Sequence, residues 1–236
     1  MYGYGTPFGY YFDPTYVLVV IAFILTLFAS FGVKATFSKY DKVKSARGIT
    51  GAEAARRILD ANGLQNIRIE HISGDLTDHY SPNENVIRLS DATYNSDSVA
   101  AIGVAAHECG HAVQHKVGYF PIKLRNSIVP VVNIGNSLSM PLFLIGLLLN
   151  MTGLAMFGAI LFGLVLVFQV VTLPVEINAS RRAMKTIEGM SILEDDELKG
   201  ARKTLTAAAM TYVAAVAATA LQFLRLLLIL NNRRRD

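Results

Sequence analysis

Residues 98–117 read SVAAIGVAAHECGHAVQHKV, an alanine-rich stretch that follows polar residues at positions 95–97. This pattern predicts a helix that begins near Ser98. His107 and His111 are four residues apart in the stretch, so their imidazoles are expected to lie on one face of the helix. Two imidazoles in this position can bind a single metal ion.

The two histidines and the residue between them form the motif H-E-x-x-H, in which Glu108 follows His107 directly. On a helix, this motif is typical of a Zn²⁺ site whose glutamate acts as a general base. Cys109 is two positions from His107, about 200° around the helix, so it is expected to face away from the metal and to fill space in the core. It is the only cysteine, which excludes an intrachain disulfide and a zinc ribbon.

The composition indicates a membrane protein. Hydrophobic residues make up 52% of the 236 residues and charged residues only 17%, whereas typical soluble domains have about 25% charged residues. The net charge is +4, but the basic residues lie beside apolar runs and not in a patch interleaved with aromatic residues. Membrane topology therefore explains them better than nucleic-acid binding, and no nucleic-acid partner is expected.

Three apolar runs are long enough to cross a bilayer, which takes about 20 residues. They are Tyr16–Val33, Ile128–Leu149 and Gly153–Leu173. A fourth run, Leu205–Leu230, has Gln222 and Arg225 in its second half, so two arrangements stay open: it crosses the membrane, or it lies partly against the other helices. The first run is expected to be an uncleaved anchor, because residues 1–15 contain no Lys or Arg.

Basic residues give the orientation through the positive-inside rule. Five follow the first run, namely Lys34, Lys39, Lys42, Lys44 and Arg47, and three follow the third run, namely Arg181, Arg182 and Lys185. We therefore expect the N-terminus outside and residues 34–127 in the cytoplasm, in a multi-pass protein of the cell membrane. If the fourth run crosses, Arg233–Arg235 end outside, against the rule.

The expected organisation has five segments. They are an N-terminal anchor span (1–33), a cytoplasmic domain with the H-E-x-x-H helix (34–127), a transmembrane hairpin (128–173), a second cytoplasmic segment (174–204) and a C-terminal helix as a candidate fourth span (205–236).

The cytoplasmic domain contains signals for a helix and a small sheet. Thr50 and Glu53 form a capping box that predicts a helix from Gly51 to about Asn62. Three β-like runs follow, namely Asn66–Ile72, Leu76–Tyr80 and Asn85–Leu89. A substrate strand is expected to pair beside Val86–Leu89. The fold class is therefore an α+β membrane protein, mostly helical, with three to four transmembrane helices and a short β-sheet.

A catalytic zinc site needs a third protein ligand. Two spans separate the histidine pair from Glu176, and an even number of crossings returns the chain to the same membrane face. The segment after Pro174 is expected to begin a helix with Glu176 and Ser180 on one face; the alternative is a carboxylate that only stabilises the helix N-terminus. His115, one turn beyond His111, is a second candidate, but we expect it to be a polar residue near the helix end.

An oxyanion formed during hydrolysis needs a positive or hydrogen-bonding group. His79 and Tyr80 are candidates, because the stretch TDHY at positions 77–80 is more polar than a strand requires. The alternative for this stretch is a turn stabilised by Asp78. Arg181 or Arg182 could also serve, although their ordinary role is to anchor the chain at the membrane surface.

Four stretches resemble the bacterial membrane-bound neutral zinc metallopeptidase family (YugP-like). They are AAHECGHAVQH (105–115), VEINASRRA (175–183), LTDHYSP (76–82) and TYVAA (211–215). The family is similar in logic to HtpX-type gluzincin proteases, in which two spans also separate H-E-x-x-H from a glutamate ligand. The resemblance implies a cytoplasmic gluzincin-like protease domain with zinc ligands His107, His111 and Glu176 and with Glu108 as base. HtpX-type enzymes have Asp four residues after the ligand glutamate, where this chain has Ser180.

The function expected from this resemblance is a zinc-dependent endopeptidase that cleaves membrane or misfolded proteins at the cytoplasmic face. Its partners would be polypeptide substrates and the lipid bilayer, with a second copy of the chain or accessory membrane proteins as further candidates. A site-2-type intramembrane protease is one alternative, but residues 98–117 are too polar to face lipid. A non-enzymatic membrane scaffold with a structural zinc site is the other, and such a site usually has four protein ligands.

Overall fold

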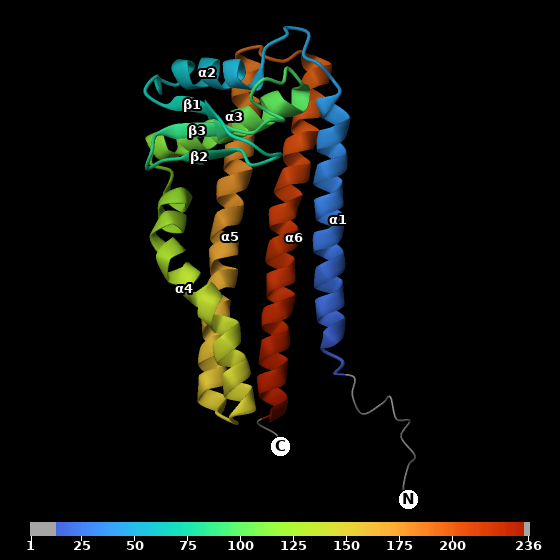
Figure 1. Ribbon diagram of the computed structural model, residues 1–236, viewed down its shortest axis with the longest axis vertical. Helices are drawn as coiled ribbons and strands as arrows, with labels where there is room; N and C mark the ends of the chain where they lie inside the picture. Colours follow the sequence, from blue (N-terminus) through green and yellow to red (C-terminus); the bar gives the residue numbers. More distant parts are fainter. Residues whose placement is uncertain (1–12, 234–236) are drawn as a thin grey trace, which may run out of the picture. The chain divides into compact units, whose positions relative to one another are not determined.

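The computed structural model describes residues 13–233, in which the chain forms six helices and three strands. The elements, labelled in Figure 1, are α1 (Tyr16–Asp41), α2 (Gly51–Ala61), β1 (Arg68–His71), β2 (His79–Ser81), β3 (Val86–Leu89), α3 (Val99–Lys116), α4 (Phe120–Leu148), α5 (Thr152–Gly189) and α6 (Asp195–Arg233). The ends of the predicted first and last segments, residues 1–12 and 234–236, lie outside the described residues.

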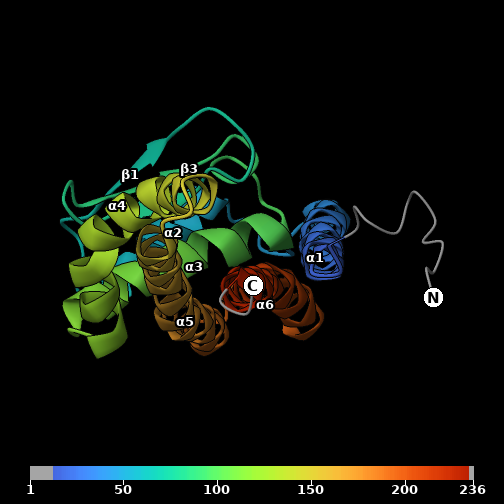
Figure 2. The ribbon, with the colours of Figure 1, turned by 90° about the horizontal axis from the view of Figure 1, so that it is seen from below.

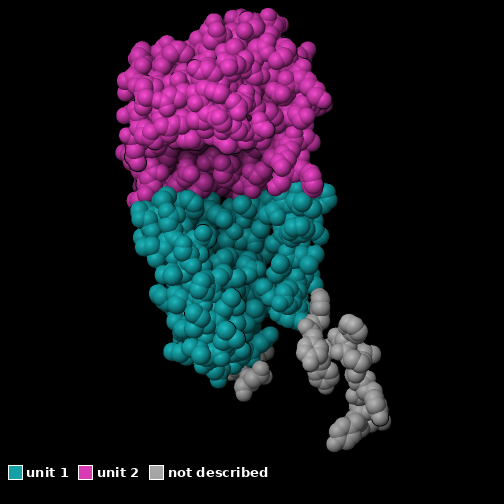
Figure 3. Space-filling model, in the orientation of Figure 1, with its two compact units in different colours: residues 1–28, 129–169, 214–236 teal, residues 29–128, 170–213 magenta. Residues whose placement is uncertain are grey.

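The chain divides into two compact units, which Figure 3 distinguishes by colour. Unit 1 comprises residues 1–28, 129–169 and 214–236, and unit 2 comprises residues 29–128 and 170–213. The long helices α1, α4, α5 and α6 each contribute to both units. The three strands and the short helices α2 and α3 belong to unit 2 alone.

Four helices in the described part of the chain, namely α1, α4, α5 and α6, are long and apolar enough to cross a membrane. Each corresponds to one of the four predicted apolar runs, although α4 ends one residue before its run does, and all four helices extend beyond their runs at one end or both. α4 begins at Phe120, before the start of the predicted run. Lys123 and Arg125 interrupt the apolar pattern of the sequence, but the helix includes them. The prediction that a helix starts after Pro174 is wrong, because α5 continues through this proline. Proline removes one backbone hydrogen bond, and long membrane helices tolerate that loss.

In unit 1, two arginines of α6 have partners. The Nη2 atom of Arg225 lies 3.9 Å from Oδ2 of Asp13, and its guanidinium carbon lies 4.3 Å from the ring centroid of Tyr16. Near the end of α6, Nη1 of Arg233 donates a hydrogen bond of 2.6 Å to the carbonyl oxygen of Leu147. The last helix therefore continues in unit 1 as far as the C-terminal end of α4.

In unit 2, the three predicted β-like runs form a three-stranded sheet in the order β1-β3-β2. β1 pairs with β3 in parallel and β2 pairs with β3 in antiparallel orientation, so Ile69 and Tyr80 lie on either side of Ile87. Both edges of β3 are thus occupied, and the prediction of a substrate strand beside Val86–Leu89 is wrong. The outer edges of the sheet belong to β1 and β2.

The start of α2 has the predicted capping box. The Thr50 hydroxyl accepts a hydrogen bond from the Glu53 backbone nitrogen at 3.2 Å, and the Glu53 carboxylate accepts one from the Thr50 backbone nitrogen at 2.9 Å. The apolar face of α2, with Ile58 and Leu59 buried, packs in the core of unit 2.

The helix α3 lies between the sheet and the helices α5 and α6, as Figure 2 shows. Ser98 caps its N-terminus, with a hydroxyl that accepts a hydrogen bond from the Ala101 backbone nitrogen at 3.1 Å. As predicted, Cys109 is fully buried, and its thiol faces the carbonyl oxygen of Ala55 in α2 at 3.6 Å. Burial raises the pKa of this thiol above its usual range. One side of α3 thus packs in the core of unit 2, and residues on another side can form a functional site.

Candidate metal centre

Two helices of unit 2 supply the predicted metal ligands. His107 and His111 lie on α3, and Glu176 lies on α5. The helices pack closely where Gly110 faces Ala179, and this contact brings the three side chains together. The potential ligand atoms of His107, His111 and Glu176 all lie within 4.8 Å of one another, which makes them the group in the described residues that could hold a metal ion.

The distances in this cluster fit Zn²⁺. The Oε2 atom of Glu176 lies 3.3 Å from Nε2 of His107 and 3.5 Å from Nε2 of His111. Two ligands of a tetrahedral zinc ion, each about 2.0–2.1 Å from the metal, are about 3.3 Å apart. Two imidazole nitrogens and one carboxylate oxygen are also the donor set of many catalytic zinc sites, which keep a fourth position for water or substrate.

The hydrogen-bond partner of His111 fixes which of its nitrogens faces the cluster. Its Nδ1 atom lies 3.1 Å from Oε1 of the fully buried Gln114. The amide nitrogen of Gln114 donates to the carbonyl oxygen of Val175 at 2.8 Å and to Oδ1 of Asn178 at 3.0 Å. Its oxygen is therefore left to accept a hydrogen bond from Nδ1 of His111, which leaves Nε2 as the metal ligand.

Ser180 is the corresponding partner of His107. Its hydroxyl oxygen lies 3.1 Å from Nδ1 of His107, one turn of α5 beyond Glu176. Ser180, which stands where HtpX-type enzymes have Asp, thus contacts a predicted metal ligand.

The carboxylates of Glu108 and Glu176 favour positive charge at the ligand cluster. Burial lowers the pKa of His111, but hydrogen bonding to Glu176 and the charge of Glu108 outweigh it, so the pKa stands above its ordinary value. The second oxygen of Glu176 lies 3.7 Å from Nη1 of Arg125, in the first turns of α4. Arg125 thus lies beside one carboxylate oxygen of Glu176, and the other oxygen, Oε2, lies beside the histidines.

His115 lies apart from the cluster. Its ring packs edge-on against Tyr80, with 5.5 Å between the ring centroids. Burial lowers its pKa, and the charges of His111 and Arg125 lower it further. The side chain of His115 is thus neutral and half-buried, and it packs from α3 against β2. This is as expected for a residue outside the metal site.

A cavity of about 150 Å³ adjoins the cluster. The polar side chains in its lining are those of Asp78, His107, Glu108, Glu176, Ser180 and Tyr212. Glu108 is 8% exposed and faces the same space as the ligands His107 and Glu176. A carboxylate, a metal site and room for a small reactant therefore meet in one cavity.

The predicted oxyanion candidates lie elsewhere in unit 2. The imidazole of the exposed His79 lies 2.9 Å from the carbonyl oxygen of Thr77, and Arg182 donates a hydrogen bond to Asn178 at 2.8 Å. Neither these residues nor Tyr80 and Arg181 are among the described residues that line the cavity. The alternative, a turn stabilised by Asp78, is not what the structure shows: the Asp78 carboxylate accepts hydrogen bonds of 2.9 Å from the backbone nitrogen and the hydroxyl of Ser90, just after β3.

Sequence reasoning missed four residues around the cluster, namely Gln114, Arg125, Asn178 and Tyr212. Gln114 follows His111 by three positions, so its place on the same helix face was the available signal. Tyr212 lies in the TYVAA stretch, but a single tyrosine in an apolar run does not by itself indicate a site. Its hydroxyl, at the cavity wall, is a hydrogen-bond donor of the kind that an oxyanion needs.

Comparisons with known proteins agree with the resemblance that the four stretches suggested. Residues 15–231 match the sequence profile of a family described as "Putative neutral zinc metallopeptidase". The "Putative membrane protease YugP" of Bacillus subtilis (strain 168) is 46% identical over 217 residues, which cover 92% of this chain and 96% of the relative. No solved structure matches the chain.

Proposed function

Because the chain belongs to this family of neutral zinc metallopeptidases, we propose that it is a membrane-bound, zinc-dependent endopeptidase that cleaves membrane or misfolded proteins at the cytoplasmic face. One observation carries the proposal: Glu108 shares a cavity with His107 and Glu176, two of the three residues in the ligand cluster. An H-E-x-x-H glutamate in such a place can act on a reactant held at the metal.

Zinc, when bound, would polarise the scissile carbonyl and make the attacking water more acidic. Glu108 takes a proton from this water and passes it to the leaving amine. Gln114 and Ser180 hold the two imidazoles in the orientation that binding requires. Tyr212 is our candidate for binding the oxyanion, because it lines the cavity, whereas such a role for His79 stays a prediction.

The distribution of charge supports a cytoplasmic site. Of the 22 Lys and Arg residues, all but Arg225 and Arg233–Arg235 belong to unit 2, which also contains the ligand cluster. The positive-inside rule assigns such a unit to the cytoplasm and the N-terminus to the outside. If α6 crosses the membrane, Arg233–Arg235 lie outside, against this rule. The hydrogen bond from Arg233 to the carbonyl oxygen of Leu147 gives one of these arginines a structural role there.

Two observations favour this proposal over the alternatives. The helix α3 is not one of the four candidate spans and buries most of its length in unit 2, whereas a site-2-type protease would carry H-E-x-x-H on a spanning helix. The ligand cluster has three protein ligands in the described part of the chain and adjoins a cavity, whereas a structural zinc site is usually closed by four.

The Glu108→Gln variant tests the proposal. It should bind zinc as the unmodified protein does, yet should lose cleavage of unfolded casein, because an amide cannot accept the proton. Glu194→Gln, at an exposed position just before α6, is the matched control and should keep both properties. Near-normal cleavage by Glu108→Gln would contradict the proposed function.

A further inference from the structure

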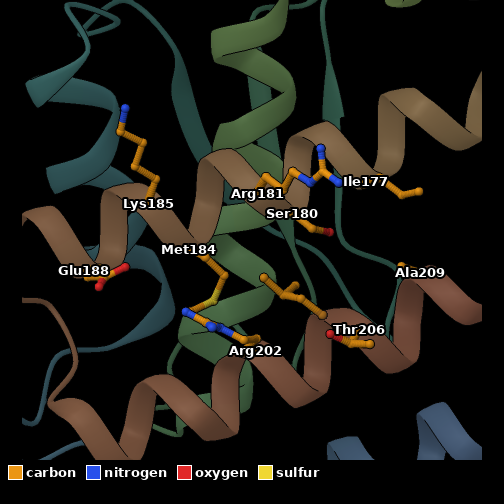
Figure 4. A pocket seen from close by; sticks show the side chains of 10 residues that line it. Ile177, Ser180, Arg181, Met184, Lys185, Glu188, Arg202, Thr206 and Ala209 are labelled. Atoms are coloured by element: carbon orange, nitrogen blue, oxygen red, sulfur yellow. The ribbon is translucent and has the colours of Figure 1, made fainter.

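A second cavity, of about 460 Å³, lies in unit 2 between α5 and α6 and is shown in Figure 4. Ser180 of α5 and Leu205 and Ala209 of α6 line this cavity and also the cavity beside the ligand cluster. The two cavities are therefore adjacent and share these three residues. We call the second cavity the α5–α6 groove.

The groove has the length of a short peptide segment. On α5 its lining runs from Ile177 to Glu188, and the part beyond Ser180, the partner of His107, spans eight residues. Eight residues of α-helix rise about 12 Å, which equals three to four residues of extended chain. A polypeptide with its scissile bond at the metal would thus fill the groove with the three or four residues on one side of that bond.

The lining combines an apolar floor with cationic side chains. Met184 and Leu205 form part of the floor, and Arg202 reaches from α6 toward Met184 in Figure 4. Arg181 and Lys185 also line the groove from α5. All three cations are exposed, and none of them forms an ion pair with another residue of the described chain. The groove has one acidic residue, Glu188, at the end away from the metal cluster.

We propose that the α5–α6 groove binds the substrate polypeptide on one side of the scissile bond and selects acidic side chains there. This inference rests on the proposed peptidase function and specifies its substrate class. The unpaired cationic side chains attract a carboxylate of the substrate, while the rest of the bound substrate segment contacts the apolar side chains of Met184 and Leu205. The position directly beside the metal cavity favours a peptide over an anionic lipid headgroup, because a lipid would gain nothing from being next to the metal cluster.

The test compares charge variants on matched peptides. A casein site that the detergent-solubilised protein cleaves is first identified by mass spectrometry. Peptides of that site are then made with Asp or Lys at each of the three positions on either side of the bond. The unmodified protein should show a higher kcat/KM for Asp at one or more positions on one side. Arg202→Glu should lower kcat/KM for that Asp peptide by about threefold to tenfold and should raise it for the Lys peptide.

Lys203→Glu provides the matched control. Lys203 is the exposed neighbour of Arg202 on α6 but does not line the groove, so the same change of net charge should leave the preference unaltered. An equal effect of both variants would overturn the inference, because it would show only a general response to charge. Equal cleavage of Asp and Lys peptides by the unmodified protein would also overturn it.

Two further results separate this inference from its rivals. If Arg202→Glu weakens binding to phosphatidylglycerol vesicles and leaves the peptide preference intact, the groove serves lipid and the inference is wrong. The proposed function fails separately, when Glu108→Gln still cleaves casein. An inactive Glu108→Gln variant together with an unchanged preference in Arg202→Glu would leave the peptidase in place and remove only the substrate groove.

Discussion

Gly110 of α3 and Ala179 of α5 approach each other so closely that a Cβ atom on Gly110 would lie 2.6 Å from the carbonyl oxygen of Ala179. The obstacle is backbone, which cannot rotate away as a flexible side chain can. His111 follows this glycine directly, and Glu176 precedes Ala179 by three residues on α5. The separation of the two helices at this point therefore sets the distance between the histidine pair and its carboxylate.

Gly110→Ala should weaken zinc binding by at least about tenfold, or ~1.4 kcal/mol, because the added methyl group forces α3 away from α5. Gly103→Ala is the matched control on the same helix. A Cβ atom there would lie 3.6 Å from Cβ of Ala201, an ordinary contact, and alanine favours the helix over glycine. Zinc titration of both variants checks the prediction, and equal affinities would show that the close approach does not set the geometry of the ligands.

Much of the candidate metal site could be predicted from sequence because its rules are local or topological. Helical spacing places His107 and His111 on one face, and an even number of spans returns Glu176 to their side. The start of α2 was also predictable, since capping by Thr50 depends only on neighbouring residues, and the start of α3 was predicted near Ser98, although the residue that caps it is Ser98 and not one of residues 95–97.

The remaining features depend on tertiary contacts that no local pattern records. Gln114 reaches Val175 and Asn178 across a gap of about 60 residues in sequence, and Arg125 approaches Glu176 from a third helix. Strand order is another such feature, because short apolar runs do not tell which strand is central. The continuity of α5 was missed for a different reason: proline is a strong local signal to end a helix, but packing and the membrane environment overrule it.

Gln114→Leu should weaken zinc binding, because the buried glutamine orients His111. Leucine keeps most of the side-chain volume but leaves Nδ1 of His111 and the carbonyl oxygen of Val175 without their partner. Loss of such an orienting hydrogen bond typically costs about tenfold to 100-fold in metal affinity. Zinc titration measures this effect. Val113→Leu, a change at a neighbouring partly buried position, should retain zinc, and equal zinc loss in both variants would indicate only damage to the packing of α3.

Labelling of introduced cysteines tests the proposed orientation. The native Cys109 is fully buried, so its background labelling should be low. Lys42→Cys, at an exposed position after α1, should be protected from an impermeant thiol reagent in intact cells. Met151→Cys, at an exposed position between α4 and α5, should be labelled. Both variants should react in lysed cells. Labelling of Lys42→Cys alone in intact cells would contradict the proposed orientation and would place the metal cluster outside the cell.

Glu176, and not His115, is expected to complete the metal site. The Glu176 carboxylate has its Oε2 atom 3.3 Å from Nε2 of His107 and 3.5 Å from Nε2 of His111, whereas the His115 ring packs against Tyr80. A carboxylate also offsets part of the charge of Zn²⁺, and this attraction is stronger in a buried site than in water. The two candidates therefore differ both in position and in charge.

We predict that Glu176→Gln weakens zinc binding by at least tenfold, about 1.4 kcal/mol, while His115→Ala leaves zinc binding nearly unchanged. Glutamine keeps the size of the side chain, so the loss reports the missing negative charge and not a cavity. Zinc titrations of the two variants side by side check the assignment, with circular dichroism to confirm that both remain folded. Zinc loss in His115→Ala together with retention in Glu176→Gln would reverse it, because a ligand carboxylate cannot lose its charge without a change in affinity.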